Sequence, residues 1–174
     1  MPEAESHTIS YFAYGSNMLL RRLHAENRAP CAVAIGTGFV EGRKFNFNKL
    51  GVDGSGKCDI AATGNMHDRA YGVLFRISPA EKSALDVVEG VGKGYIDREV
   101  QVVTPGGAMT AVTYVAIMKA PALRPYHWYK AFVVAGAMEH GLPHNYIEWL
   151  RSIESQADPN TRRRKDNEAI LLGD

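Results

Sequence analysis

Apolar and polar residues alternate in several segments of the chain, and this pattern predicts β-strands. The alternation is clearest in 43–49, where Phe45 and Phe47 share one face, and in 71–77. Other expected strands are β-branched or aromatic and are bounded by turn residues. They span 8–14, 31–40, 58–63, 95–103 and 109–118. Two glycines in the middle of 31–40 indicate a bend or bulge in that strand.

Helical signals separate these strands. Ser78 followed by Pro79 is a cap with proline at the first helical position, and it predicts a helix over 79–88. A helix is also expected over about 18–26, after the opening strand, with Asn17 as its cap.

The C-terminal third predicts a helix pair. Residues 126–140 and 143–154 favour helix, and Gly141 between them is typical of a helix C-terminus. The remaining tail contains the basic run 162–165 and is expected to be frayed. Its four charges are expected to be solvated rather than to bind RNA.

Strands in hairpin sequence, with short helices between and after them, predict an α+β fold. We expect a mixed, largely antiparallel, barrel-like sheet rather than a doubly wound parallel one. With 174 residues and 45% apolar content, the chain should form a single domain over 1–174. Its core is expected over about 8–158, followed by a polar tail at 159–174.

The overall charge and the cysteines narrow the class of protein. The 20 basic and 19 acidic side chains give a formal net charge of +1, so no overall field attracts nucleic acid or an anionic membrane. Cys31 and Cys58 have no pairing signature and suit a reducing compartment. The N-terminus has neither a basic start nor an apolar run, and no apolar stretch approaches the ~20 residues of a membrane helix. We expect a cytoplasmic protein with small-molecule partners.

The first candidate for chemistry is the segment YFAYGSNM at 11–18, which runs from a strand through a glycine turn into a helix start. Such a turn leaves backbone N–H groups unpaired, with the positive end of the helix dipole behind them. It suits a carboxylate or a phosphate. A plain strand-to-helix connection is the alternative.

The second candidate is Glu89, where an apolar helix ends against a glycine-rich loop. A carboxylate that becomes buried here could carry a proton near neutral pH. A negative charge at a helix C-terminus is otherwise unfavourable, so an exposed glutamate is the competing interpretation. Asp86, one turn earlier, is the weaker candidate and is expected to be solvated or capping.

Four motifs in order carry a resemblance to a known family. They are FAYGSNM at 12–18, AYGVLF at 70–75, LDVVEG at 85–90 and GLP at 141–143. Together with Tyr129-Lys130 and the terminal helix pair, they resemble the γ-glutamylcyclotransferase family over roughly 9–159. The resemblance implies a small mixed barrel-like fold without a cofactor. It also implies a reaction in which a γ-glutamyl amino acid cyclises to 5-oxoproline and releases a free amino acid.

The resemblance also assigns site residues. Glu89 is the expected catalytic acid and base. The substrate-holding loop falls on Tyr14, Gly15, Ser16, Asn17 and Met18, and the pocket tyrosines fall on Tyr95, Tyr114 and Tyr129. The partner is a small γ-glutamyl substrate, and a homodimer is possible.

Other interpretations stay open or are weaker. The same loop and glutamate could serve a cyclising enzyme for γ-glutamylamines or carrier-linked γ-glutamyl groups, or a non-catalytic binding protein for an acidic small molecule. His140 and His144 are separated by Gly141 and Pro143, which interrupt the helical face that metal ligation would use. The cysteines suit packing, and Ser16 lacks the second glycine of a nucleophile elbow.

Overall fold

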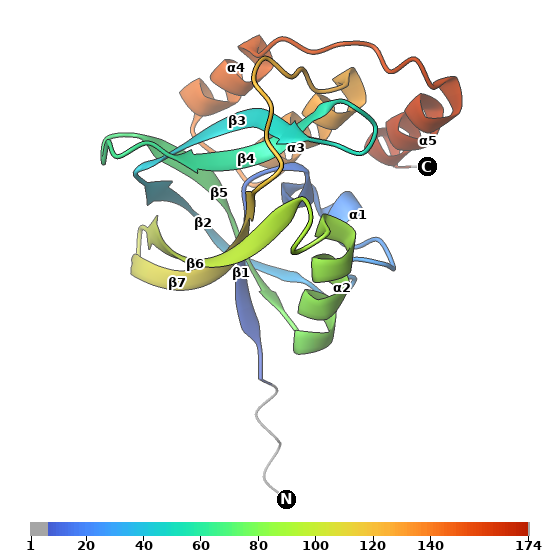
Figure 1. Ribbon diagram of the computed structural model, residues 1–174. Coiled ribbons are helices and arrows are strands. Elements are labelled where there is room, and N and C mark those ends of the chain that lie inside the picture. The colour runs from blue at the N-terminus through green and yellow to red at the C-terminus, as the bar shows by residue number, and fades with distance from the viewer. Residues whose placement is uncertain (1–6, 174) are drawn as a thin grey trace, which may run out of the picture.

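Five of the expected strands form a closed barrel in the computed structural model, which describes residues 7–173 (Figure 1). In spatial order the strands are β1 (Ile9–Ala13), β5 (Arg69–Ile77), β2 (Val33–Glu41), β6 (Tyr95–Thr104) and β7 (Gly107–Ala116). Neighbouring strands are antiparallel, except for the parallel pair of β1 and β7 that closes the barrel. The mixed, largely antiparallel, barrel-like sheet expected from the sequence is confirmed.

The strand β2 contains the expected irregularity. Its register against β5 shifts between Ala34 and Gly36, so the glycine marks a β-bulge. Further along, Gly38 lies so close to β6 that a Cβ atom there would be 2.5 Å from the carbonyl oxygen of Val103. The two glycines therefore bend the strand and bring it against its neighbour.

A separate hairpin consists of β3 (Arg43–Leu50) and β4 (Gly56–Ala62). Phe45 and Phe47 are both buried and pack edge to face, with ring centroids 5.0 Å apart. Phe45 also contacts Trp149, and Phe47 contacts Tyr129, so this apolar face is covered by the C-terminal helices. In Figure 1 the hairpin lies between the barrel and those helices.

The helix α2 (Pro79–Glu89) has strong end signals. Ser78 accepts a hydrogen bond from the Glu81 amide, and the Glu81 side chain accepts one from the Ser78 amide, which completes a capping box. The helix ends at Gly90, which has a φ of 65° in the left-handed region. These two ends fix Glu89 as the last residue of the helix.

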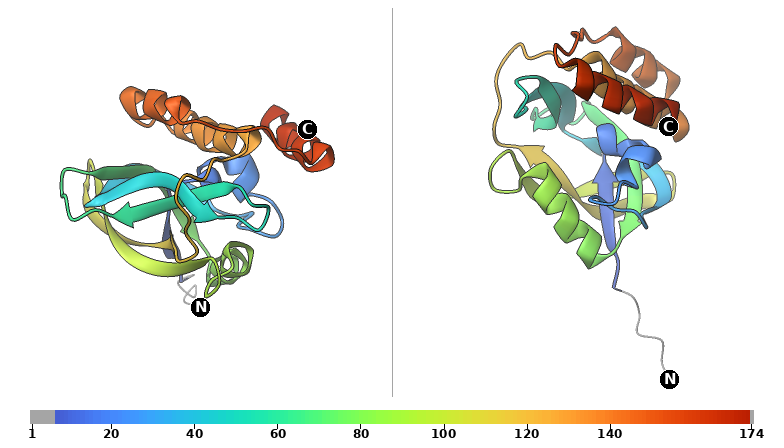
Figure 2. Two further views of the ribbon diagram at one scale, coloured as in Figure 1. Left: turned by 45° about the horizontal axis from the view of Figure 1, so that its top comes forward. Right: turned by 90° about the vertical axis from the view of Figure 1, so that its right-hand side faces the viewer.

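The expected helix pair is present as α3 (His127–Glu139) and α4 (His144–Ser152). Gly141 has a φ of 65° and allows the turn between them. With α5 (Thr161–Leu172), these helices form a layer on the side of the barrel opposite the start of β1, whereas α2 lies beside the barrel (Figure 2). Among residues 7–173, no helix combines the length and the apolar character needed to cross a membrane.

Two expectations about the helices were wrong. The helix over 18–26 is replaced by a 3-10 turn, η1 (Ser16–Met18), and a single helical turn, α1 (Leu20–Leu23), because Leu19 between them is extended. The Asn17 side chain caps neither of them. The tail is not frayed within the described residues, because 161–172 form α5 with Asn160 as its side-chain cap.

Candidate active site

A small pocket, here called the inner pocket, lies where the turn after β1 meets the C-terminal end of α2. It has a cavity volume of about 30 Å³. Its lining consists of Tyr11, Tyr14, Gly15, Ser16, Asn17, Cys58, Glu89, Tyr95, Tyr114 and Tyr129. The fold thus brings the glycine turn and Glu89, which are more than 70 residues apart in the sequence, to one site together with all three expected tyrosines.

Met18 is the expected site residue that does not line this pocket. Its side chain is fully buried in the core, and its carbonyl oxygen accepts a hydrogen bond from Nε2 of His140 at 2.9 Å. The helix α3 approaches it closely, because a Cβ atom on Gly136 would lie 2.7 Å from the Cβ atom of Met18. Met18 therefore anchors the turn to α3 from behind.

Glu89 is held by two neighbours. Its Oε1 atom accepts a hydrogen bond from Nδ2 of Asn17 at 3.0 Å and lies 3.6 Å from the guanidinium of Arg28. The side chain is 19% exposed, so it is partly desolvated but still open to the pocket. A carboxylate at a helix C-terminus is unfavourable by itself, and these two donors offset that effect.

Asn17 connects several groups at the centre of the site. Its Nδ2 atom donates to Glu89 and also to the hydroxyl of Tyr11 at 3.1 Å, and its Oδ1 atom accepts from Arg28 at 3.0 Å. The side chain is buried. This use of both amide atoms explains why Asn17 does not cap the following helix.

The tyrosines around the pocket are fixed by backbone contacts. The hydroxyl of Tyr14 donates to the carbonyl of Tyr114 at 2.5 Å, and the hydroxyl of Tyr95 donates to the carbonyl of Cys58 at 2.6 Å. Burial raises the pKa of both hydroxyls well above the ordinary value. The two phenols therefore stay protonated near neutral pH and act as neutral hydrogen-bonding groups.

Cys58 is a structural residue of the pocket wall. Burial raises the pKa of its thiol to about 12, so the thiolate needed for nucleophilic chemistry is absent near neutral pH. A Cβ atom on Gly15 would lie 2.8 Å from both the Cβ and Sγ atoms of Cys58. Glycine is required at this position because the turn touches β4 directly, and the predicted packing role of the cysteine fits this contact.

Asp86 lies outside the inner pocket but contacts its wall. The hydroxyl of Tyr114 donates to Oδ1 of Asp86 at 2.7 Å, and Lys82 forms an ion pair with the same oxygen. Burial, followed by this hydrogen bond to a carboxylate, raises the pKa of Tyr114. Asp86 therefore holds a pocket tyrosine in place.

A larger cavity, here called the outer pocket, adjoins the inner one. Its volume is about 670 Å³, and both pockets share Ser16, Glu89, Tyr95 and Tyr129. Five cationic side chains line it: Arg22, Arg28, Lys49, Lys57 and Lys93. Sequence reasoning did not identify these residues, because they come from separate segments and form no local motif.

Several known proteins that resemble this chain share one description. A model described as the AIG2-like family matches residues 69–150. The gamma-glutamylcyclotransferase of Mus musculus is 32% identical over 158 residues, which cover 86% of this chain and 81% of the mouse protein. That of Homo sapiens is 31% identical over 177 residues, with 97% and 88% covered. The solved structure of a gamma-glutamyl cyclotransferase superposes with a TM-score of 0.85 and 28% identity, covering 96% of this chain and 100% of the other.

Proposed function

The chain belongs to the γ-glutamylcyclotransferase family, and from this membership we propose that it converts a γ-glutamyl amino acid to 5-oxoproline and a free amino acid. One observation in the structure supports the proposal most directly. Glu89 is the carboxylate that lines the inner pocket, and it lies at the junction with the outer pocket. A group in this position can take a proton from the attacking nitrogen of the substrate and give it to the departing nitrogen.

The reaction needs a proton carrier. The substrate's α-ammonium must lose a proton before its nitrogen attacks the γ-carbonyl carbon, and the departing nitrogen must gain a proton before its bond to that carbon breaks. Glu89 takes the first proton and returns it to the departing nitrogen. Overall, the attacking nitrogen loses two protons and the departing nitrogen gains two near neutral pH, so the steps balance without water or a cofactor.

The pocket supplies orientation as well. Attack by the substrate's own amine is intramolecular, and well-oriented groups reach effective molarities of about 10⁵ M or more. We propose that the folded γ-glutamyl chain lies at the junction of the two pockets, against the turn at 15–17. Within residues 7–173, the backbone amides of Gly15 and Asn17 have no protein acceptor, so they can donate to the α-carboxylate or to the developing oxyanion.

The test replaces the proton carrier by a residue of the same shape. In Glu89→Gln, we expect the fold to be retained and 5-oxoproline formation from γ-glutamylalanine to fall by about 10²-fold or more, because an amide cannot shuttle the proton. The matched control is Glu99→Gln, an exposed glutamate on β6 outside both pockets. Product is measured by chromatography, and the fold by circular dichroism.

Three results would contradict the proposal. If Glu89→Gln turned over at the wild-type rate, the proton carrier would be another group. If the wild-type protein bound γ-glutamyl compounds without forming 5-oxoproline from amino acid, amine or peptide derivatives, it would be a binding protein. A product from γ-glutamylamines alone would identify the related amine-releasing reaction instead.

A further inference from the structure

The outer pocket has an excess of positive charge. Five cationic side chains line it, and Glu89 is the carboxylate among its lining residues. Two of the cations have carboxylate neighbours. Lys57 forms an ion pair with Asp53 at 2.9 Å, and Arg28 lies 3.6 Å from Glu89. The remaining positive charges of this pocket come from Arg22, Lys49 and Lys93.

Arg22 is a half-buried cation held by neutral groups. Its Nε atom donates to the hydroxyl of Ser16 at 3.0 Å, and its guanidinium lies 4.9 Å from the ring centroid of Phe132. Burial lowers the pKa of Arg22 to about 10, and the charge of Arg28 adds to this effect. The guanidinium is therefore poised to gain from a nearby anion.

Lys49 gives the strongest indication of a ligand. It lies on β3, is only 9% exposed, and borders the outer pocket with its Nζ atom 4.9 Å from the ring centroid of Tyr95. In the part of the chain that the structure describes, no carboxylate lies within ion-pair distance of this ammonium. The side chain is largely buried and its ammonium opens to the pocket, so the charge is partly desolvated without a partner, and burial lowers the pKa of Lys49 accordingly.

Gly94 also lies close to the side chain of Lys49. A Cβ atom on Gly94 would lie 2.8 Å from Cε and 2.9 Å from Nζ of the lysine. Gly94 therefore leaves space for the amine at the pocket wall, and Tyr95, the next residue, is shared by both pockets. The amine is thus beside the junction at which Glu89 lies.

We propose that the outer pocket selects γ-glutamyl compounds whose leaving group is a dicarboxylic amino acid, with Lys49 binding the second carboxylate. This inference rests on the proposed function, because it requires that the γ-glutamyl group lies at the junction of the two pockets, against the turn at 15–17. The bond to be broken then lies beside Glu89, and the leaving group extends into the outer pocket. Every leaving amino acid brings one carboxylate, and an acidic side chain brings the second.

The best test compares two substrates that differ in charge and hardly in shape. For the wild-type protein, we expect kcat/KM for γ-glutamylglutamate to exceed that for γ-glutamylglutamine by about tenfold, the effect of one hydrogen bond between charged groups. Raising the salt concentration should reduce this ratio, because screening weakens the attraction. This second measurement needs no variant.

The variant Lys49→Met removes the charge and keeps an unbranched apolar side chain. We expect it to bring the ratio close to one, mainly through a higher KM for γ-glutamylglutamate. The matched control is Lys44→Met, which replaces an exposed lysine on the same strand outside both pockets and should keep the wild-type ratio.

The outcomes separate this inference from the proposed function. Turnover of both substrates at equal kcat/KM in the wild type, or an unchanged ratio in Lys49→Met, would overturn the inference and leave the cyclotransferase activity in place. Absence of 5-oxoproline from both substrates and from γ-glutamylalanine would overturn the proposed function itself.

Discussion

A single side chain, Asn17, positions Glu89, the group that we propose as the proton carrier. Its amide nitrogen donates to Glu89 and to Tyr11, and its amide oxygen accepts from Arg28. The carboxylate is thereby fixed between a neutral donor and a cation at the end of α2. Because Asn17 is itself buried, it has little freedom to move, and it transmits the position of the turn to Glu89.

Replacing Asn17 by alanine removes these hydrogen bonds and leaves Arg28 as the remaining neighbour that holds Glu89, so the carboxylate is less well positioned. We expect kcat for γ-glutamylalanine to fall by about 10²-fold, which is the loss associated with a small misplacement of a reacting group. Steady-state kinetics and a thermal melt of the same preparation measure the effect. Asn48→Ala, on β3 and outside both pockets, is the control. A wild-type kcat in Asn17→Ala would show that the hydrogen bond does not position Glu89.

At the scale of elements, the sequence predicts those structures whose signals are local. Alternation, β-branched and aromatic content and turn residues identified the strands to within a few residues, and Ser78-Pro79 identified the start of α2, where the capping box forms. The helix expected at 18–26 is interrupted at the extended Leu19, and Asn17, its expected cap, instead contacts Glu89, 72 positions away in the chain. Local helix propensity does not report such long-range side-chain contacts.

In the candidate site too, some residues could be predicted from the sequence and others depend on tertiary structure. The turn at 14–18, Glu89 and the tyrosines could be predicted because the family resemblance assigns them, and all but Met18 line the inner pocket. Lys49 and Arg28 belong to no motif, and they reach the site only after the hairpin and the loop before β2 have folded against α2. Their positions depend on tertiary structure, which periodicity does not report.

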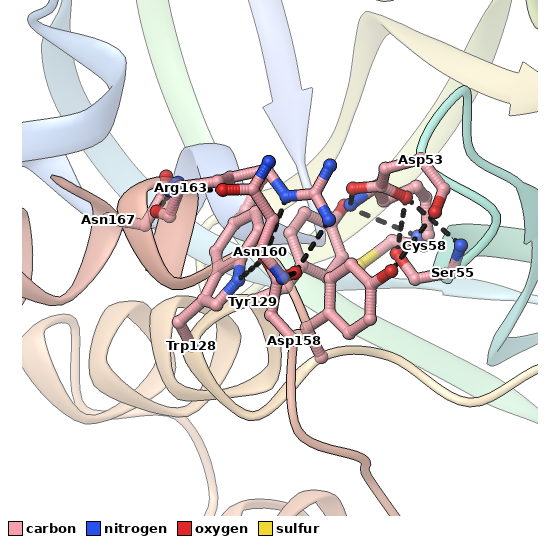
Figure 3. A network of polar contacts seen from close by, with 12 residues as sticks. Asp53, Ser55, Cys58, Trp128, Tyr129, Asp158, Asn160, Arg163 and Asn167 are labelled. Atoms are coloured by element: carbon pink, nitrogen blue, oxygen red, sulfur yellow. Dashed lines mark hydrogen bonds and ion pairs between the residues drawn. The ribbon is translucent and has the colours of Figure 1, made fainter. Parts of the chain in front are cut away.

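The helix α5 is anchored by a buried carboxylate. Asp158 accepts hydrogen bonds from Nε1 of Trp128 at 2.9 Å and from Nε and Nη2 of Arg163 at 2.7 and 2.6 Å (Figure 3). Arg163 also lies over the ring of Tyr126, whose hydroxyl donates to the carbonyl of Asp53. Asp53 pairs with Lys57 of the outer pocket, so the contacts continue from α5 to the pocket wall.

This anchor makes a prediction about pH. The hydrogen bonds from Arg163 lower the pKa of Asp158 in the folded state below its unfolded value of 3.8. The contribution to stability is therefore present at neutral pH and is lost as the pH falls below about 4. We expect Asp158→Asn to lower the melting temperature at neutral pH and to differ less from the wild type as the pH approaches about 2. Asp166→Asn, an exposed position on α5, should change little at any pH. A difference that stays constant with pH would contradict this account.

At the scale of the whole molecule, the barrel consists of two parts joined at two narrow seams. Strands β1, β5 and β2 pair over long registers, as do β6 and β7. The parts meet through one register pair at each side, Tyr11 with Val112 and Phe39 with Val103. The inner pocket straddles the first seam, because Tyr11 and Tyr14 come from β1 and the turn after it, whereas Tyr114 comes from β7.

Side chains reinforce this first seam, and one of them offers a test of the coupling between barrel closure and activity. The hydroxyl of Thr113 on β7 is fully buried and donates to the carbonyl of Phe12 on β1 at 2.7 Å. Thr113→Val keeps the shape but removes that bond, so we expect the free energy of unfolding to fall by about 1–3 kcal/mol. Denaturant unfolding measures this loss, and kcat for γ-glutamylalanine reports whether the pocket tyrosines also move apart.

Thr110→Val, at an exposed position of the same strand, is the control for the substitution itself. Because the loosened seam separates Tyr14 from Tyr114, activity should fall together with stability. A loss of stability with unchanged kcat would mean that the pocket is held by the turn and α2 alone.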